Sequence, residues 1–279
     1  MSKTILITGC SSGIGLHCAQ RLKEDGHRVF ATARKIADVE MLLEQGFESV
    51  QLDLSNAASV DSGLNTVLDR TNNELFALFN NGAYGQPGAV EDLTRDVIRE
   101  QFETNLFGTM QLTNKLIPLM RKQGYGRIIH NSSVLGLVSL PFRGAYNASK
   151  YALEGFADTQ RLELHNSGVY ISLIEPGPIT SKFRENAFRK YQENIVKENS
   201  FFKEKYQAIE ERLKKEGPAA PFTLGPEAVY TKLLHALDSE KPKSRYYVTF
   251  PTYLLGTLKR LLPGSGLDWV LRKISADEN

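Results

Sequence analysis

Short apolar runs alternate with longer amphipathic stretches through the first 180 residues of the chain. Runs of four or five residues, typical of strands buried on both faces, occur at 4–8, 28–32, 49–52, 76–79, 126–130 and 170–174. Helical periodicity fills the intervals, for example at 13–24, 56–69 and 95–120. Repeated strand–helix–strand units predict an α/β fold, a Rossmann-type doubly wound parallel sheet with helices on both faces. We expect a single domain over 1–279.

The pattern changes after residue 180. Residues 181–224 are polar and charged, yet they contain six aromatic side chains, Phe183, Phe188, Tyr191, Phe201, Phe202 and Tyr206. We interpret this range, the lid segment, as a helical cover over a substrate; ordinary core contacts are the alternative. A further helix is predicted to begin at Gly225-Pro226-Glu227, because Pro and Glu favour the first helical turn. A last strand is predicted at 245–250.

Residues 251–279 form a C-terminal extension with apolar and basic faces over 253–274. Such a segment could make a peripheral contact with a membrane surface. Packing on its own domain or on a partner subunit is the interpretation we favour. No apolar run approaches the roughly 20 residues that span a bilayer, so no transmembrane segment is predicted.

Composition is ordinary for a soluble globular protein, with 41% hydrophobic and 24% charged residues. The formal net charge of +2 is too small to indicate a nucleic-acid partner. Two cysteines, Cys10 and Cys18, suggest no disulfide framework. Without a cleavable signal pattern at the start of the chain, we expect a cytoplasmic protein. The five histidines lack metal-ligand spacing, so no metal site is expected.

Tyr146 and Lys150 are the strongest chemical signal. A spacing of four places both side chains on one face of a helix. Tyrosine has a pKa of roughly 10, and a neighbouring ammonium favours the phenolate and lowers that pKa. The pair is therefore predicted to exchange a proton with an alcohol or carbonyl, and Ser133 could hydrogen-bond the same substrate oxygen. Two residues on a solvated helix face are the competing interpretation of the pair alone.

A glycine-rich turn follows the first predicted strand and opens a helix. Glycines let the backbone approach a pyrophosphate, and the helix N-terminus offers it free amides. The candidate cofactor-binding residues here are Gly9, Ser11, Ser12, Gly13, Ile14 and Gly15. Their Gly-x-x-x-Gly-x-Gly spacing differs from the common dinucleotide pattern.

Arg34 follows the second predicted strand, where an NAD site usually has an acidic residue for the ribose 2′-hydroxyl. Because an arginine pairs well with a 2′-phosphate, we predict NADP(H); a surface Arg34–Lys35 pair is the alternative. Asp53, with Leu54 beside it, could contact adenine or simply form a strand-end turn. Asn80 and Gly82, after the fourth strand, could border the cofactor or form an Asn-Gly turn.

Together these motifs resemble the short-chain dehydrogenase/reductase family over about residues 3–180. The residues that carry the resemblance are 8–15, Asn80, Asn81, Asn105, Ser133, Tyr146, Lys150, Pro176 and Gly177. The chain is most similar to NADP-dependent members near 17β-hydroxysteroid and retinol dehydrogenases and bacterial aldehyde reductases. One departure is that the family's Ala-Gly at 82–83 is exchanged to Gly-Ala. Ala83 could therefore need a costly positive φ.

The resemblance implies a role for each matching residue. Tyr146 would be the acid/base, Lys150 would also bind the nicotinamide ribose, and Ser133 would steady the substrate oxygen. Asn105 would hold a water that links Lys150 to solvent. The nicotinamide would lie against Pro176, Gly177, Ile179 and Thr180.

We therefore expect a hydride transfer between NADPH and the carbonyl of a bulky apolar aldehyde or ketone, or the reverse alcohol oxidation. Long-chain aldehydes, retinoids and steroids are the candidate substrates. A 3-oxoacyl carrier-protein reductase is one alternative, against which the lid segment and extension argue. A non-catalytic NADP(H)-binding regulator is another, but such a protein would typically lack Tyr146 or Lys150. A homodimer or homotetramer is implied, paired through helices near 95–120 and 144–166.

Overall fold

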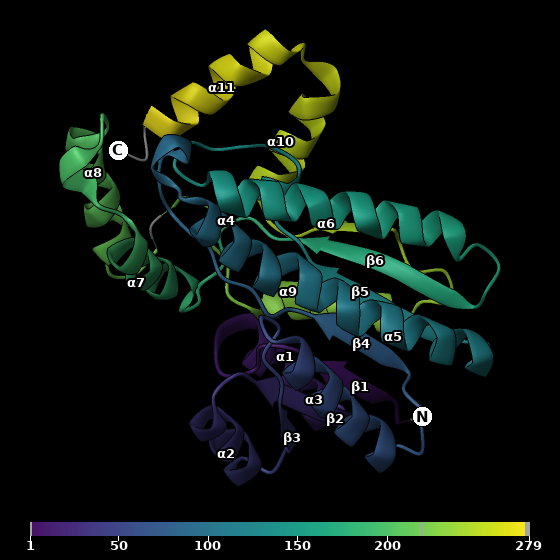
Figure 1. The fold of residues 1–279 in the computed structure, drawn as a ribbon. Helices are drawn as coiled ribbons and strands as arrows, with labels where there is room; N and C mark the ends of the chain where they lie inside the picture. The colour runs from purple at the N-terminus through teal and green to yellow at the C-terminus, as the bar shows by residue number, and fades with distance from the viewer. Residues whose placement is uncertain (1, 219, 277–279) are drawn as a thin grey trace.

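The computed structural model describes residues 2–218 and 220–276. Residue 219 of the lid segment and residues 277–279 of the C-terminal extension lie outside the described residues. Parallel strands form one central sheet in the order β3-β2-β1-β4-β5-β6-β7 (Figure 1). Their bounds are β1 Thr4–Ile7, β2 Arg28–Ala33, β3 Glu48–Gln51, β4 Ala77–Asn80, β5 Gly126–Asn131, β6 Val169–Glu175 and β7 Arg245–Tyr247.

The strand order confirms the doubly wound α/β fold. The chain begins at β1 in the middle of the sheet, winds outward to β3, and then returns to β4 on the other side of β1. Neighbouring strands pair in parallel throughout this sheet. The direction of winding therefore reverses between β1 and β4, and folds of this type place their ligands in the crevice at that point.

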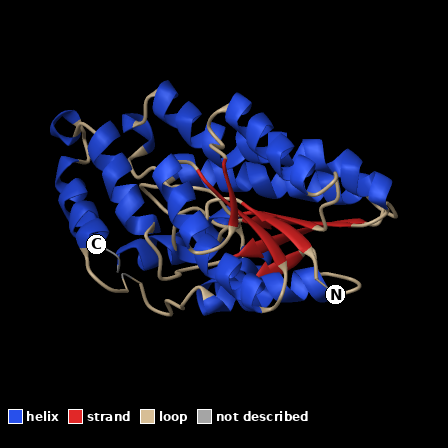
Figure 2. Ribbon diagram, turned by 90° about the horizontal axis from the view of Figure 1, so that it is seen from below, coloured by secondary structure: helices blue, strands red, loops and turns tan. Residues whose placement is uncertain are grey.

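Two helical layers cover the sheet, as Figure 2 shows by the blue helices on either side of the red strands. α1 (Gly13–Glu24), α2 (Ile36–Glu44) and α9 (Glu227–Asp238) pack on one face. α3 (Ala57–Arg70), α5 (Gly108–Gln123) and α6 (Gly144–Glu163) pack on the other. Alternation along β1 serves both layers, because Ile5 and Ile7 face the first core and Leu6 faces the second.

The helix predicted at 95–120 is a composite. α4 (Arg95–Phe102) continues through a π-helical turn, Glu103–Phe107, into α5. A Cβ on Gly108 would lie 1.9 Å from the carbonyl oxygen of Leu54, so only glycine lets the start of α5 approach the loop after β3 this closely. Asn105 is buried in the π-helical turn.

The lid segment has a hydrophobic core of its own. It comprises α7 (Phe183–Asn194), a 3₁₀ turn (Lys197–Asn199) and α8 (Lys203–Lys214). The fully buried Tyr206 packs against Tyr191 and donates a hydrogen bond to Asp92 at 2.5 Å. Asp92 ends another 3₁₀ turn, Val90–Asp92. The lid segment is thus anchored to the loop after β4 rather than hanging free.

The C-terminal extension folds back on the domain. The predicted strand over 245–250 is wrong at its end, because β7 stops at Tyr247 and Phe250 begins a helix. α10 (Phe250–Leu261) and α11 (Gly264–Ala276) bury Leu255 and Leu271 against Val138. In the described parts of the chain, no helix is both long enough and apolar enough to cross a membrane. A peripheral membrane contact stays a prediction.

Candidate active site

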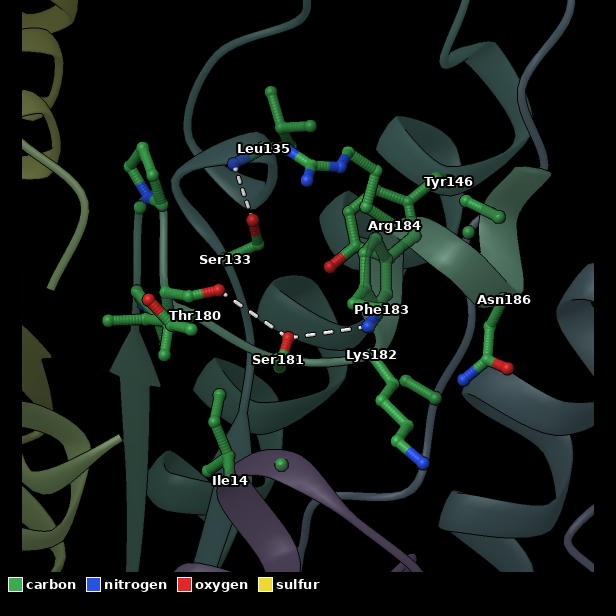
Figure 3. A pocket seen from close by; sticks show the side chains of 18 of the residues that line it. Ile14, Ser133, Leu135, Tyr146, Thr180, Ser181, Lys182, Phe183, Arg184 and Asn186 are labelled. Carbon is green, nitrogen blue, oxygen red and sulfur yellow. Dashed lines mark hydrogen bonds between the residues drawn. The ribbon is translucent and has the colours of Figure 1, made fainter. Parts of the chain in front are cut away.

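A cavity of about 610 Å³ opens where β1, β4, β5 and β6 end (Figure 3). The glycine-rich turn forms one wall, and the loop after β6, the lid segment and α6 form the others. The predicted site residues that line it are Gly9, Ser11, Ser12, Gly13, Ile14, Gly82, Ser133, Tyr146, Lys150, Pro176, Gly177, Ile179 and Thr180. Residues that are far apart in the sequence thus line one cavity.

The glycine positions of the glycine-rich turn leave no room for a side chain. Gly9 and Gly13 adopt positive φ values of 71° and 60°. A Cβ on Gly15 would lie 2.3 Å from the carbonyl oxygen of Gly9 and 2.5 Å from Nδ2 of Asn81. The turn is therefore a backbone cradle at the start of α1, which fits the pyrophosphate of a dinucleotide.

Asn81 holds this cradle in place. Its Nδ2 donates hydrogen bonds to the carbonyl oxygens of Thr8 and Gly9 at 3.0 and 3.1 Å, and its Oδ1 accepts one from Asn131 at 2.9 Å. Asn80 is the cofactor-binding residue predicted from the sequence at this position, and that contact stays a prediction. The structure places Asn80 in the interior, where it donates to Thr113 at 2.9 Å. Strand residues alternate between faces, so neighbouring asparagines at a strand end point to different places.

The residues next to Asn81 also pack tightly. Leu54 lies behind Gly82, because a Cβ on Gly82 would lie 2.8 Å from Leu54 Cδ1. The strain expected at Ala83 is not present: Ala83 is not among the non-glycine residues with positive φ in the described chain. The exchanged Gly-Ala pair therefore fits this backbone.

Tyr146, Lys150 and Ser133 meet at the inner end of the cavity. α6 carries the tyrosine and the lysine, and both are buried. Lys150 Nζ donates a hydrogen bond to the carbonyl oxygen of Asn131 at 2.7 Å and lies 5.7 Å from the centroid of the Tyr146 ring. Ser133 caps a 3₁₀ turn, Val134–Gly136, by accepting a hydrogen bond from the Leu135 amide at 3.1 Å (Figure 3).

Burial controls the protonation of this group. It raises the pKa of Tyr146 to about 12, and a hydrogen bond with Ser133 opposes that rise only in part. It also lowers the pKa of Lys150 to about 8, partly offset by the charge of Glu154. The expected lowering of the tyrosine pKa is therefore absent from the protein alone, because loss of water disfavours the phenolate more than its neighbours stabilise it.

The two adjacent serines have different surroundings. Ser132 donates a hydrogen bond of 2.5 Å to Glu154, whereas Ser133 is hydrogen-bonded to Tyr146. The thirteen-residue spacing that pointed to Ser133 therefore agrees with the geometry.

Asn105 does not line the cavity. Its Oδ1 accepts a hydrogen bond from the Tyr84 amide at 3.2 Å, and its Nδ2 donates to the Tyr84 carbonyl and to Ser149 at 3.0 and 3.1 Å. Both ends of the side-chain amide thus have protein partners, and they join the loop after β4 to α6. Binding of a water by Asn105 stays a prediction.

Arg34 and Asp53 also lie outside the cavity. Arg34 is exposed just after β2, and Asp53 accepts hydrogen bonds from the amide and hydroxyl of Ser55 at 2.9 and 2.7 Å. The latter contacts match the strand-end turn that was the alternative for Asp53.

Phe183 is the only one of the six predicted lid aromatics among the residues that line the cavity. Its ring meets that of Tyr146 edge to face, with 5.3 Å between centroids, and Figure 3 shows the two side by side. The next residue, Arg184, was missed in the sequence. It donates to the carbonyl oxygens of Lys215 and Gly217 and so ties α7 to the segment after α8.

The chain is similar to known proteins in both sequence and structure. A family model described as short chain dehydrogenase matches residues 3–192. The chain is 47% identical to the uncharacterized oxidoreductase YbbO of Escherichia coli K12, over 98% of this chain and 95% of that protein. It is 34% identical to human 17-beta-hydroxysteroid dehydrogenase type 1, over 89% and 78% of the two chains. A solved short-chain dehydrogenase/reductase of Burkholderia phymatum in complex with NAD superposes with a TM-score of 0.76 at 25% identity, covering 93% and 92%.

Replacing Gly15 tests the cradle. We expect Gly15→Ala to overpack the turn, at a cost of about 1–3 kcal/mol in folding stability. The displaced turn should then bind the dinucleotide roughly 10- to 100-fold more weakly. Titration of NADPH fluorescence measures the affinity. Gly155→Ala is the matched control, because a Cβ there meets nothing within 4 Å and should stabilise α6 by about 0.5–1 kcal/mol. Unchanged NADPH affinity in Gly15→Ala would rule out the cradle as the binding site.

Proposed function

The chain belongs to the short-chain dehydrogenase family, and we propose that it is an NADP(H)-dependent reductase of bulky apolar aldehydes or ketones, able also to oxidise the corresponding alcohols. Membership makes it an oxidoreductase that acts on a CH–OH group. The observation that carries the finer proposal is the meeting of Tyr146, Lys150 and Ser133 with a dinucleotide cradle in one cavity.

The cofactor, when bound, supplies or accepts the hydride at the substrate carbon. Tyr146 is protonated at neutral pH because burial raises its pKa to about 12, so it can donate a proton to the carbonyl oxygen as that carbon is reduced. Ser133 donates a hydrogen bond to the same oxygen. Lys150 is held by the Asn131 carbonyl, and in this proposal it would bind the ribose hydroxyls.

Alcohol oxidation needs the opposite proton transfer, from the alcohol to a Tyr146 phenolate. The protein alone opposes that ionisation through burial. The positive charge of an oxidised nicotinamide next to the ring favours the phenolate and lowers the pKa of Tyr146. Tyr146 therefore suits reduction as the protein stands and suits oxidation once the oxidised cofactor is bound.

Apolar side chains that line the cavity near Tyr146 support an apolar substrate. Leu135, Leu140, Phe183, Ala187 and Leu213 all contribute to the walls. Because Tyr206, Tyr191 and Phe202 pack in the lid core without lining the cavity, specificity depends on the few lid residues that face the cavity. Phe183 is foremost among these because it touches the proposed proton donor.

We also infer a homodimer or homotetramer, as the family resemblance implies. Apolar side chains stand exposed on the predicted pairing helices, namely Phe107 at 51%, Phe156 at 49% and Leu162 at 68% exposure. Covering them with a second copy would remove this apolar surface from water.

Tyr146→Phe removes only the phenol oxygen. We expect kcat for carbonyl reduction to fall by about 10²–10⁴-fold, while NADPH still binds. Steady-state NADPH oxidation and fluorescence titration measure the two effects. Tyr170→Phe is the control, since Tyr170 lies partly exposed on β6 and its ring contact with Arg127 is preserved. Substantial turnover by Tyr146→Phe would exclude the tyrosine as the acid.

In our proposal, Arg34 determines the preference for NADP(H) over NAD(H). Removing a charged hydrogen bond to the 2′-phosphate costs about 1.5–3 kcal/mol, so Arg34→Gln should raise the KM for NADPH by roughly 10- to 100-fold and leave that for NADH nearly unchanged. Arg99→Gln, which removes an exposed charge from α4, controls for general electrostatics. Equal effects on the two cofactors would contradict NADP(H) selection through Arg34.

Phe183→Ala tests the substrate class. Loss of the ring should lower kcat/KM for decanal about tenfold through lost apolar contact and change that for propanal little. Phe188→Leu is the matched control, because Phe188 packs in the lid core and its replacement should affect stability but not the decanal-to-propanal ratio. A ratio unchanged in Phe183→Ala would show that Phe183 does not contact the substrate.

A further inference from the structure

A buried ionic cluster lies behind the cavity, and the proposed chemistry does not use it. Arg245 of β7 donates to Asp158 of α6 at 3.0 and 2.8 Å and to Glu154 of α6 at 2.9 Å. Its Nε is also 3.1 Å from Oε1 of Glu175, the last residue of β6. One guanidinium thus joins three carboxyl groups from two elements. A second arginine, Arg161, contacts only the outermost of these, Asp158, at 3.1 Å.

The first arm of the cluster reaches the turn that carries Ser133. Glu154 Oε2 faces Arg245, while its Oε1 accepts the 2.5 Å hydrogen bond from Ser132. The same carboxyl group packs against the turn, because a Cβ on Gly136 would lie 3.1 Å from Glu154 Oε1. Arg245 therefore fixes Glu154, and Glu154 fixes the residue before Ser133 and the turn that Ser133 caps.

The second arm reaches the loop proposed to hold the nicotinamide. Glu175 is 0% exposed and immediately precedes Pro176 and Gly177, which line the cavity. Within the described residues, neither carboxyl oxygen of Glu175 has a hydrogen-bond partner, so the contact with Arg245 is its principal polar interaction. A buried carboxyl group is costly without such a partner. Consistent with this, burial raises the pKa of Glu175 to about 9.

The two arms are also joined directly, because the Val134 amide donates to the Pro176 carbonyl at 2.8 Å. A shift of Arg245 would therefore move the Ser133 turn and the Pro176 loop together. Among the described residues, Arg245 is the one cation that contacts all three carboxyl groups.

We propose that Arg245 is a positioning residue, which sets the Ser133 turn through Glu154 and the nicotinamide loop through Glu175. This role rests on the proposed function, since it names the two sides of the reaction centre that must stay in register. A displacement of about 1 Å at such a centre can cost about 100-fold in rate. The residue itself touches neither substrate nor cofactor.

Arg245→Met replaces the arginine with an apolar side chain of similar length. It removes the contacts with both Glu154 and Glu175. We expect kcat to fall about 10- to 100-fold and the Kd for NADPH to rise severalfold, with a smaller change in the KM for the carbonyl. Loss of Arg245 leaves Glu154 with Ser132 and Asp158 with Arg161 as partners. Glu175 is left with no partner, which could unfold this variant. The decisive protein is therefore Arg245→Met/Glu175→Gln, which also replaces that buried carboxyl group with a neutral amide. The Tm of this double variant should recover toward the wild-type value, whereas kcat and NADPH affinity should stay low.

Arg161→Gln is the matched control: it removes a charge from the same cluster without affecting either arm, so kcat and NADPH affinity should remain near wild type. Recovery of kcat and NADPH affinity together with Tm in the double variant would overturn the proposal, since it would show a purely structural role. If the wild type binds NADPH but reduces no carbonyl, the proposed function fails, and the NADPH affinity of the double variant decides the positioning role by itself.

Discussion

The hydrogen bond from Lys150 to the Asn131 carbonyl is the constraint on which the site depends. A buried ammonium needs a partner, and this one finds it at the end of β5. That contact fixes the distance of α6 from the sheet. It also places Tyr146, one turn earlier on the same helix face, beside the cavity and within reach of Ser133.

The same burial that positions the pair determines its chemistry. Out of water, the phenol of Tyr146 keeps its proton and the ammonium of Lys150 gives up its own more readily. A protonated tyrosine can act as the proton donor to a carbonyl oxygen, but the raised pKa makes this phenol a weaker acid. The opposite reaction needs an additional positive charge near the ring, which an oxidised nicotinamide would supply if it binds against the loop after β6 as proposed.

Much of this could be predicted from the sequence, because local patterns carry it. The predicted helix over 13–24 agrees with the observed bounds of α1, because the glycine-rich turn precedes it and its apolar residues recur with helical periodicity. Ser133, Tyr146, Lys150 and the glycine-rich turn meet as the family resemblance implied. The sequence was least informative where tertiary packing decides the outcome. Asn80 and Asn81 differ only in which way each side chain points, and the sign of the Tyr146 pKa shift depends on depth of burial, which no motif encodes. Five of the six lid aromatics lie away from the cavity lining. Four of them, Phe188, Tyr191, Phe202 and Tyr206, pack in the lid core, and Phe201 is exposed.

Ultraviolet difference titration of Tyr146, with the Tyr146→Phe protein subtracted, tests the central claim most directly. Without cofactor, we predict no ionisation of Tyr146 up to about pH 10, because burial raises its pKa to about 12. With saturating NADP⁺, the midpoint should fall by roughly 1–3 pH units, the usual effect of a nearby opposite charge. A midpoint that is the same with and without NADP⁺, or one already near neutrality in the protein alone, would contradict the account.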